Sequence, residues 1–195
     1  MRALLIPIIA LAVRPAIPDP EPPRPSNRAA LVAIALDEVG TREATGRNDG
    51  ARVNEYQSVT GTPGLAWCGS FVAWVGVECQ ERYGFLNVYP TGAQAAWSPT
   101  WGQGGSTKRS DIDKARGGDT FQLFYRSLSP PRIGHVGLVE STTTAGVITI
   151  EGNTSDAQAI NLGASDREGQ GVYRKRRPKA GIYSTTDHLG GLILH

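Results

Sequence analysis

The hydrophobic pattern of the chain changes type at Gly117-Gly118, and this change constrains the fold more than any other feature. Before this point, apolar residues recur at spacings of three and four, most clearly from Cys68 to Cys79, which is typical of one face of a helix. After it, short apolar and β-branched runs alternate with turn sequences, which is typical of strands joined by hairpins. Helices followed by a series of antiparallel strands predict an α+β fold.

The same patterns predict where each element lies. Ser26 is a suitable N-cap for the first helix, and Gly40 is a suitable end for it. Further helices are expected over 51–59, 68–83 and 91–98, followed by a surface loop over 102–110. Strands are expected over five ranges, of which the last two have the weaker pattern: 120–125, 135–141, 147–152, 172–176 and 181–184.

The first 26 residues differ in composition from the rest, because seven of the 13 prolines lie among them. Proline at this density excludes helix and central strand, so residues 14–26 are expected to form an extended, semi-rigid linker. The apolar run from Ala3 to Val13 resembles a secretory signal, although it is short and Pro7 interrupts it. A segment that docks on a partner or on the domain is the alternative. We therefore expect three parts: an arm over 1–26, a domain over 27–186 and a tail over 187–195.

Composition and charge exclude several classes of protein. The net charge of +2 gives no electrostatic argument for binding nucleic acid. No apolar run reaches the ~18 residues of a transmembrane helix, so no membrane span is expected. The two cysteines are too few for the disulfide framework of a small secreted domain.

The two cysteines have different expected roles. Along a helix they would stand roughly 16 Å apart, whereas a disulfide requires Cα atoms within about 7 Å. Cys79 lies in the middle of the apolar stripe and is expected to be a small buried hydrophobic residue. Cys68 lies at the first turn, where unpaired N–H groups and the helix dipole favour the nucleophilic thiolate. An inert buried thiol remains the alternative for Cys68.

One of the three histidines is placed to act as a base. His188 and His195 lie in the Gly-rich C-terminal tail, with no partner suggested. His135 begins an expected strand, and the flanking residues Gly134 and Gly137 leave room for another group to approach its ring.

The next expected strand ends in two polar acceptors, Glu151 and Asn153, which share one face of the sheet. A hairpin that turns about Thr143 places His135 opposite Glu151, with Val136 opposite Ile150, and leaves the apolar core on the other face. A turn about Thr144 places His135 opposite Asn153 instead. Directly opposite and diagonal neighbours both lie within side-chain reach, so either register orients the imidazole.

A cysteine at a helix N-terminus, a histidine on a strand and an acceptor form the set required for cysteine-nucleophile catalysis. The alternative is three polar residues that never meet. Four motifs in this order resemble the CHAP family of cysteine, histidine-dependent amidohydrolases/peptidases, which are papain-like, NlpC-type cysteine hydrolases. The resemblance covers about residues 28–176 and rests on Trp67–Trp74, Arg116–Asp119, Gly134–Val139 and Ile150–Thr154.

The resemblance implies a papain-like fold in which the Cys68 helix packs on an antiparallel sheet. It implies Cys68 as nucleophile, His135 as general base, Glu151 as the group that orients the imidazole, and Asn153 as a fourth polar group near the ring. The Cys68 backbone N–H would contribute to an oxyanion hole. The implied substrate is peptidoglycan, cut at an N-acetylmuramoyl–L-alanine amide or at a peptide bond.

Trp67 and Gly134 are expected to line the substrate cleft. No cofactor is expected, and the sparse acidic loop around Asn48 and Asp49 predicts no metal. The basic run Arg174–Lys179 is interpreted either as a grip on anionic wall polymers or as a solvated edge strand. Trp97 and Trp101 are assigned either to ligand stacking or to the edge of the core.

The expected location is extracytoplasmic, on a phage tail or secreted to the bacterial cell wall, and residues 1–26 would provide the tether to a larger assembly. Two alternatives remain from the sequence. One is a catalytically silent structural component of a virion or envelope, and the other is an acyltransferase that uses the same Cys–His pair.

Overall fold

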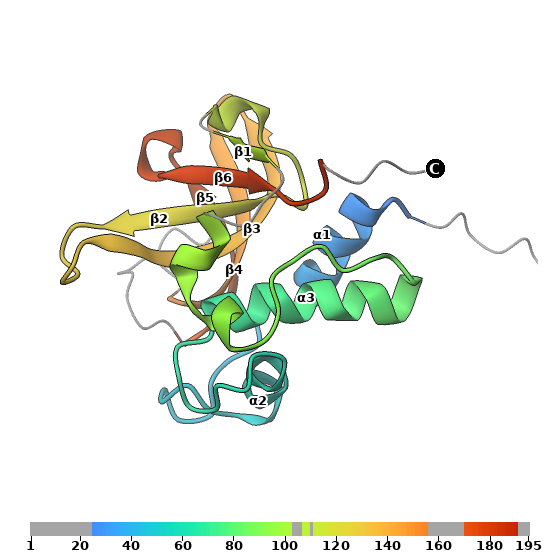
Figure 1. Ribbon diagram of the computed structural model, residues 1–195, viewed down its shortest axis with the longest axis vertical. Coiled ribbons are helices and arrows are strands. Elements are labelled where there is room, and N and C mark those ends of the chain that lie inside the picture. Colours follow the sequence, from blue (N-terminus) through green and yellow to red (C-terminus); the bar gives the residue numbers. More distant parts are fainter. Residues whose placement is uncertain (1–24, 103–106, 110, 156–169, 191–195) are drawn as a thin grey trace, which may run out of the picture.

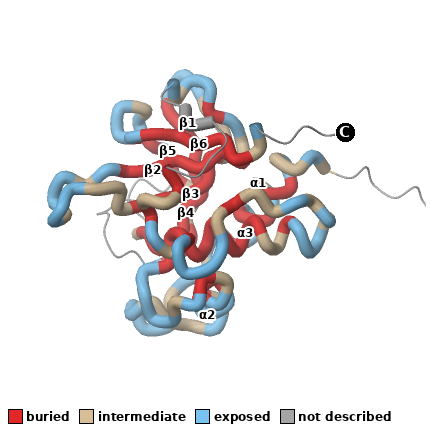
Figure 2. The backbone as a smooth tube through the Cα atoms, viewed as in Figure 1, coloured by how far each residue is buried: buried red, intermediate tan, exposed pale blue. Residues whose placement is uncertain are grey.

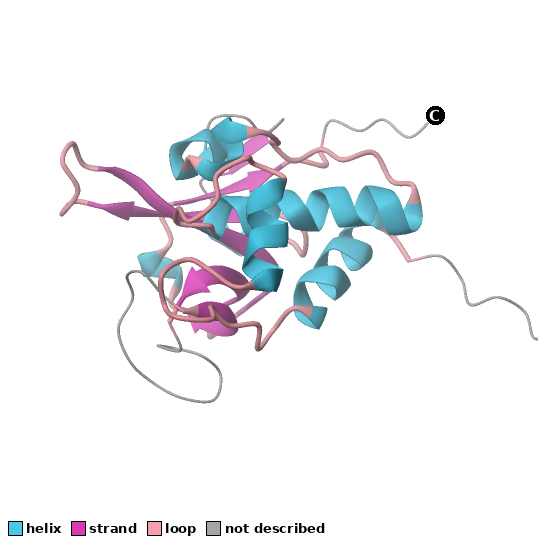
Figure 3. Ribbon diagram, turned by 90° about the horizontal axis from the view of Figure 1, so that it is seen from below, coloured by secondary structure: helices cyan, strands magenta, loops and turns pink. Residues whose placement is uncertain are grey.

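The computed structural model describes residues 25–102, 107–109, 111–155 and 170–190. The predicted signal and most of the predicted arm lie outside the described residues. The chain has an α+β fold in which three α-helices lie together beside an antiparallel sheet (Figures 1 and 3). No helix in the described part has the length and apolar character needed to cross a membrane.

The predicted helices are confirmed within a few residues. Ser26 caps the first helix by accepting a hydrogen bond from the backbone N–H of Ala29, and Gly84 ends the third in a left-handed conformation. The segment expected as one short helix over 91–98 is instead two 3₁₀ turns, η1 and η2. The helical bounds are α1 Asn27–Asp37, α2 Ala51–Ser58, α3 Cys68–Tyr83, η1 Ala93–Ala96, η2 Ser98–Gly102, η3 Ile112–Lys114 and η4 Lys179–Gly181.

Six strands form one sheet in the order β1-β6-β2-β3-β4-β5. Their bounds are β1 Thr107–Arg109, β2 Thr120–Tyr125, β3 Arg132–Thr143, β4 Gly146–Thr154, β5 Gly171–Arg177 and β6 Ser184–Asp187. Two predictions were wrong. Part of the expected loop over 102–110 is β1, and the strand expected over 181–184 begins only at Ser184, because the η4 turn occupies the residues before it.

The sheet is buried on both faces, which the sequence analysis did not predict. Helix α3 packs against β3 and β4, and Phe71, Val136, Leu138 and Ile150 belong to the larger core between helices and sheet. A second, smaller cluster covers the opposite face and includes Phe121, Val139, Val147 and Ile182. Figure 2 shows the burial continuing from the sheet into α3. His135 therefore lies on a face that has its own apolar packing.

The β3–β4 hairpin settles the register that the sequence left open. Leu138 pairs with Ile150 and Val139 with Thr149, which corresponds to a turn about Thr144. Of the two registers considered, the one that places Val136 opposite Ile150 is therefore not the one observed. An irregularity between Val139 and Ser141 shifts the outer part of the hairpin by one residue.

The predicted tail begins inside the fold. Asp187 ends β6, where its carboxylate pairs with Arg28 at 2.5 Å and with Arg116 at 2.9 Å, and His188 is buried directly after it. Arg28, on the first turn of α1, also pairs with Asp119 at 2.6 Å. These ion pairs tie the first helix to the sheet, so the domain extends beyond residue 186.

Candidate active site

Cys68 is the first residue of α3, and the end of β4 fixes this helix terminus. The backbone N–H of Trp67 donates to the Oδ1 atom of Asn153 at 3.0 Å. A Cβ atom on Gly152 would stand 2.7 Å from Phe71, so only glycine lets β4 approach the first turn of α3 this closely. The helix that begins at Cys68 is thus anchored directly on the strand that carries Glu151.

His135 lies near the start of β3, and its Nε2 atom is 2.9 Å from the Oε2 atom of Glu151. In the observed register Glu151 is a diagonal neighbour of His135, reached across Gly137. Gly137 has no Cβ, and the space is taken by Phe121 and by the Glu151 side chain. The space beside Gly137, which was expected to be open to an approaching group, is therefore used by the side chain of Glu151.

Arg177 and Thr149 hold the Glu151 carboxylate from its other side. Arg177 donates from Nε to Oε1 and from Nη2 to Oε2, each at 2.6 Å, and the Thr149 hydroxyl donates to Oε1 at 2.6 Å. Glu151 is fully buried. Burial alone would raise its pKa, but the contacts of Arg177 and His135 outweigh burial and hold the pKa far below its usual range. The carboxylate is therefore ionised and accepts a hydrogen bond from the Nε2–H group of His135.

The thiol and the imidazole shift each other's pKa in opposite directions. Burial raises the pKa of Cys68, but hydrogen bonding to His135 and its charge outweigh burial and lower the pKa to about 7. Burial lowers the pKa of His135, but Cys68 and Glu151 raise it to about 9. Between these values the pair exists as thiolate and imidazolium, which is the reactive form of a nucleophilic cysteine.

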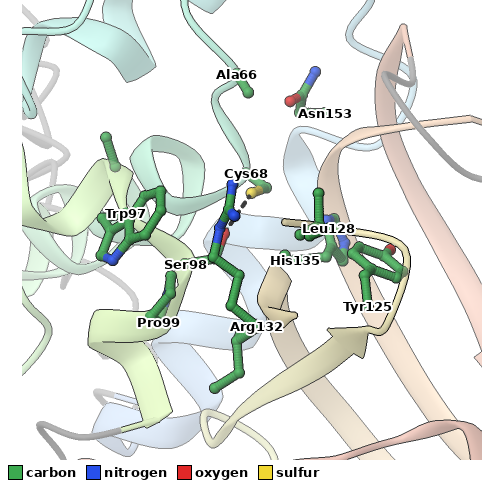
Figure 4. Close-up of a pocket in the computed structure, with 13 residues that line it drawn as sticks. Ala66, Cys68, Trp97, Ser98, Pro99, Tyr125, Leu128, Arg132, His135 and Asn153 are labelled. Carbon is green, nitrogen blue, oxygen red and sulfur yellow. Dashed lines mark hydrogen bonds between the residues drawn. The ribbon is translucent and has the colours of Figure 1, made fainter. Parts of the chain in front are cut away.

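A cavity of about 210 Å³ opens over Cys68 and His135. Its walls come from the N-terminus of α3, the η1–η2 segment and the β2–β3 hairpin (Figure 4). The lining residues are Ala66, Cys68, Ala96, Trp97, Ser98, Pro99, Tyr125, Leu128, Arg132, Ile133, Gly134, His135 and Asn153. Both reactive side chains are thus at the base of a site large enough for part of a substrate.

Two of the site's residues, Ser98 and Arg132, were not predicted. Ser98 places its hydroxyl 3.4 Å from the Cys68 sulfur, and Arg132 lies over Trp97 with 4.9 Å between its guanidinium carbon and the ring centre. Trp97, for which stacking and the edge of the core were both considered, is 53% exposed and lines the cavity, whereas Trp101 is fully buried. The η1–η2 segment that brings Ser98 and Trp97 to the site carries only a weak sequence pattern.

Trp67 does not line the cleft, and that prediction was wrong. Its side chain is fully buried, stacks on Tyr56 and donates from Nε1 to Glu43 at 2.8 Å. As the N-cap residue of α3, it turns its ring into the core while Cys68 faces the cavity. Gly134 does line the cavity, but the space beside it is filled by Tyr125, whose ring would meet a Cβ atom at 2.2 Å.

Asn153 lines the cavity, and its side chain also forms hydrogen bonds that support the backbone around Cys68. Besides accepting from Trp67, its amide nitrogen donates to Glu43 at 3.3 Å and to Asn48 at 3.1 Å. These contacts join β4, the loop before α2 and the start of α3. Besides the role expected beside the imidazole, Asn153 therefore has one in positioning Cys68.

The basic run was interpreted in two ways, and neither describes it fully. β5 is an edge strand, yet Lys175 is fully buried with its ammonium group on Thr154, and Arg177 is buried on Glu151. Arg174, in contrast, pairs with Glu140 at 2.5 Å near the surface. The period-two alternation of a strand could have indicated that Lys175 and Arg177 share a face.

The acidic loop before α2 was the candidate considered for a metal. The Asp49 carboxylate accepts hydrogen bonds from the backbone and hydroxyl of Thr45, at 2.9 and 2.7 Å. Within the described ranges, no group of three or more His, Cys, Asp or Glu side chains has the arrangement of a metal site.

Compared with known proteins, the chain matches no protein-family model, no curated protein and no solved structure.

Proposed function

We propose that this protein is a cysteine hydrolase that cleaves an amide bond through a covalent acyl-enzyme. The proposal is carried by one observation: the Cys68 thiol, at the start of α3, interacts with an imidazole whose other nitrogen is held by an ionised, buried carboxylate. This is the arrangement of nucleophile, base and orienting group that cysteine-dependent acyl transfer requires.

The contacts of His135 assign its two nitrogens. Because Nε2–H donates to Glu151, Nδ1 is the atom that takes the Cys68 proton. The thiolate attacks the carbonyl carbon of the amide, and the negative charge moves to the carbonyl oxygen. N–H groups in the first turn of α3 lack intrahelical acceptors and would stabilise that oxyanion.

In the second half of the reaction, His135 first acts as an acid and then again as a base. The imidazolium gives its Nδ1 proton to the leaving amine, the C–N bond breaks, and a thioester to Cys68 remains. Nδ1 then takes a proton from water, the hydroxide attacks the thioester, and the proton returns to the sulfur as the acid product leaves. The cycle consumes one water and needs no cofactor.

Peptidoglycan is the substrate class we propose, with cleavage at the muramoyl–L-alanine amide or at a peptide bond. Support comes from the four CHAP-like motifs and from their order on the fold: nucleophile helix, then the strand of His135, then the strand of Glu151. A papain-like fold is part of this proposal. The location we propose is extracytoplasmic, on a phage tail or secreted to the cell wall.

A zymogram on purified bacterial cell walls tests the hydrolase directly. The expected result is a lytic band that Cys68→Ala reduces by at least about a thousandfold, since the nucleophile has no substitute. Cys79→Ala is the matched control. Cys79 is buried on the same helix, with its thiol 3.6 Å from Asn27, and its replacement should leave lysis intact.

The outcomes separate the candidate classes. If wall preparations of different chemistry show no lysis, a structural component is favoured. If mass spectrometry finds acyl groups transferred to an added amine without net hydrolysis, an acyltransferase is favoured. New amino termini in the digested fragments would identify the bond that is cut.

A further inference from the structure

The candidate cavity contains one permanently charged side chain, Arg132. Its other lining residues are neutral or, in the case of Cys68 and His135, form the reactive pair. In Figure 4 the Arg132 side chain extends into the same space as the Cys68 sulfur. A cation at this place acts on any ligand group that approaches the nucleophile.

Arg132 has no carboxylate partner among the residues that the structure describes. Its hydrogen bonds both come from Nη1, which donates to the carbonyl oxygens of Ser129 and Pro130 at 3.5 and 3.2 Å. Arg28, Arg52, Arg82, Arg116, Arg174 and Arg177, in contrast, each form an ion pair with a carboxylate. Among the described residues, the partly buried Arg132 is therefore left without a counter-ion, unlike the partly buried Arg28, Arg52 and Arg174 and the buried Arg177.

The contacts of Arg132 also fix its orientation. Nη1 is used by the hairpin carbonyls, and the guanidinium carbon lies over the ring of Trp97. This leaves the Nε and Nη2 hydrogens, which form the edge that binds a carboxylate through two parallel hydrogen bonds. Because the hairpin carbonyls and the Trp97 ring already hold the guanidinium in place, Arg132 loses less conformational entropy on binding a ligand than a flexible arginine would.

We propose that Arg132 is a specificity-determining residue that binds a free carboxylate of the substrate close to the scissile amide. The inference rests on the proposed function and narrows it: the preferred substrates are acidic wall peptides that carry a carboxylate beside the cleaved bond, in preference to their amidated forms.

Alkylation of Cys68 tests the carboxylate site without any natural substrate. Iodoacetate carries a carboxylate, and iodoacetamide is its neutral counterpart. Arg132→Gln should lower the ratio of the iodoacetate rate to the iodoacetamide rate by roughly tenfold, as expected for a lost charge-assisted hydrogen bond. The rate with iodoacetamide should stay within about twofold of wild type. Mass spectrometry of the labelled peptide separates Cys68 from Cys79.

Arg126→Gln is the matched control, because Arg126 is exposed on the same hairpin and does not line the cavity. It should leave the ratio unchanged. An unchanged ratio in Arg132→Gln, or an equal fall in both variants, would overturn the proposal.

A binding measurement distinguishes failure of this inference from failure of the hydrolase. In a Cys68→Ala background, a muramyl peptide with a free carboxylate should bind roughly tenfold more tightly than its carboxamide form, and Arg132→Gln should remove the difference. If that preference is found without wall lysis by the unmodified chain, the carboxylate site stands and the hydrolase fails. If lysis occurs with equal binding of both peptides, the hydrolase stands and the carboxylate site is wrong.

Discussion

Two histidines lie buried at different places along the sheet, and they have opposite charge properties. His135 on β3 and His188 after β6 are 6% and 5% exposed. The Nε2 atom of His135 meets the Glu151 carboxylate, whereas that of His188 meets the hydroxyl of Thr120 at 3.0 Å. The Nδ1 atom of His188 is buried without a hydrogen-bond partner among the described residues.

This difference in partners decides the charge of each ring. Burial lowers the pKa of both histidines. Cys68 and Glu151 overcome burial at His135 and raise its pKa to about 9. At His188 burial dominates and lowers the pKa to about 4, because the attraction of Asp187 is too weak to offset it. The Asp187 oxygens are already engaged by two arginines. A buried histidine is therefore charged only where an anion contacts it directly.

The largest expected effect comes from removing the anion at His135. In Glu151→Gln, the pKa of His135 should fall well below 9, the thiolate should no longer form near neutral pH, and wall hydrolysis should drop by about a hundredfold. Arg177 loses its counter-ion, so the free energy of unfolding should fall by roughly 3 kcal/mol. Histidine NMR titration, fragment release from cell walls and urea unfolding measure the three changes.

Asp187→Asn is the control for that variant, because it also removes a buried carboxylate that pairs with arginine, but one that does not line the cavity over Cys68. It should reduce stability while leaving the alkylation rate of Cys68 near wild type. If both variants slow alkylation equally, loss of stability rather than of charge explains the effect.

The second effect appears in stability at acid pH. Unfolded His188 binds a proton near pH 6.5 but folded His188 only near pH 4, so its contribution to stability is complete above pH 6.5 and is lost as the pH falls to about 4. This difference corresponds to roughly 3 kcal/mol. The difference in unfolding free energy between wild type and His188→Gln should therefore narrow by about this amount as the pH falls from 6.5 to 4. If urea unfolding shows the same free-energy difference between the two proteins at pH 6.5 and at pH 4, the low pKa of His188 is wrong.

The smallest expected effect comes from the Ser98 hydroxyl, which should change the pKa of Cys68 slightly without deciding whether the thiolate forms. The Ser98 hydroxyl lies 3.4 Å from the Cys68 sulfur and lowers the pKa of the thiol, after the larger effects of burial and His135. Ser98→Ala should move the midpoint of the alkylation-versus-pH curve upward from about 7 and slow alkylation at pH 7 a few-fold. If Ser98→Ala moves this midpoint as far as Glu151→Gln does, the hydroxyl rather than the carboxylate decides whether Cys68 is a thiolate.

Local periodicity predicted most elements of the fold. The helix from Cys68 to Tyr83 and the strand over 120–125 were confirmed at their predicted bounds, since their apolar residues follow one period without interruption. The strand expected over 181–184 was misplaced, since the η4 turn ends at Gly181 and the strand begins only at Ser184. Of the two hairpin registers that the sequence left open, the turn about Thr144 is the one observed for the inner pairs, and the irregularity between Val139 and Ser141 leaves no signal in the spacing.

The candidate site was only partly predictable. Cys68, His135 and Glu151 are brought together as the sequence analysis proposed, since each has a residue type and a position typical of its role. Ser98 and Arg132 come from segments whose path depends on packing. Arg177 was taken as part of a basic surface run, although its charge is buried on Glu151.

The sequence alone determined where most of the helices and strands lie, that Cys68 starts a helix, and that the two cysteines cannot bond to each other. These properties depend on neighbours a few residues apart along the chain. Only the tertiary structure decided which buried histidine carries a charge, which tryptophan faces the cavity, and that Arg132 in the cavity wall has no carboxylate partner among the described residues. Each of these depends on the charge or volume of a group that is distant in sequence and within a few ångströms in space.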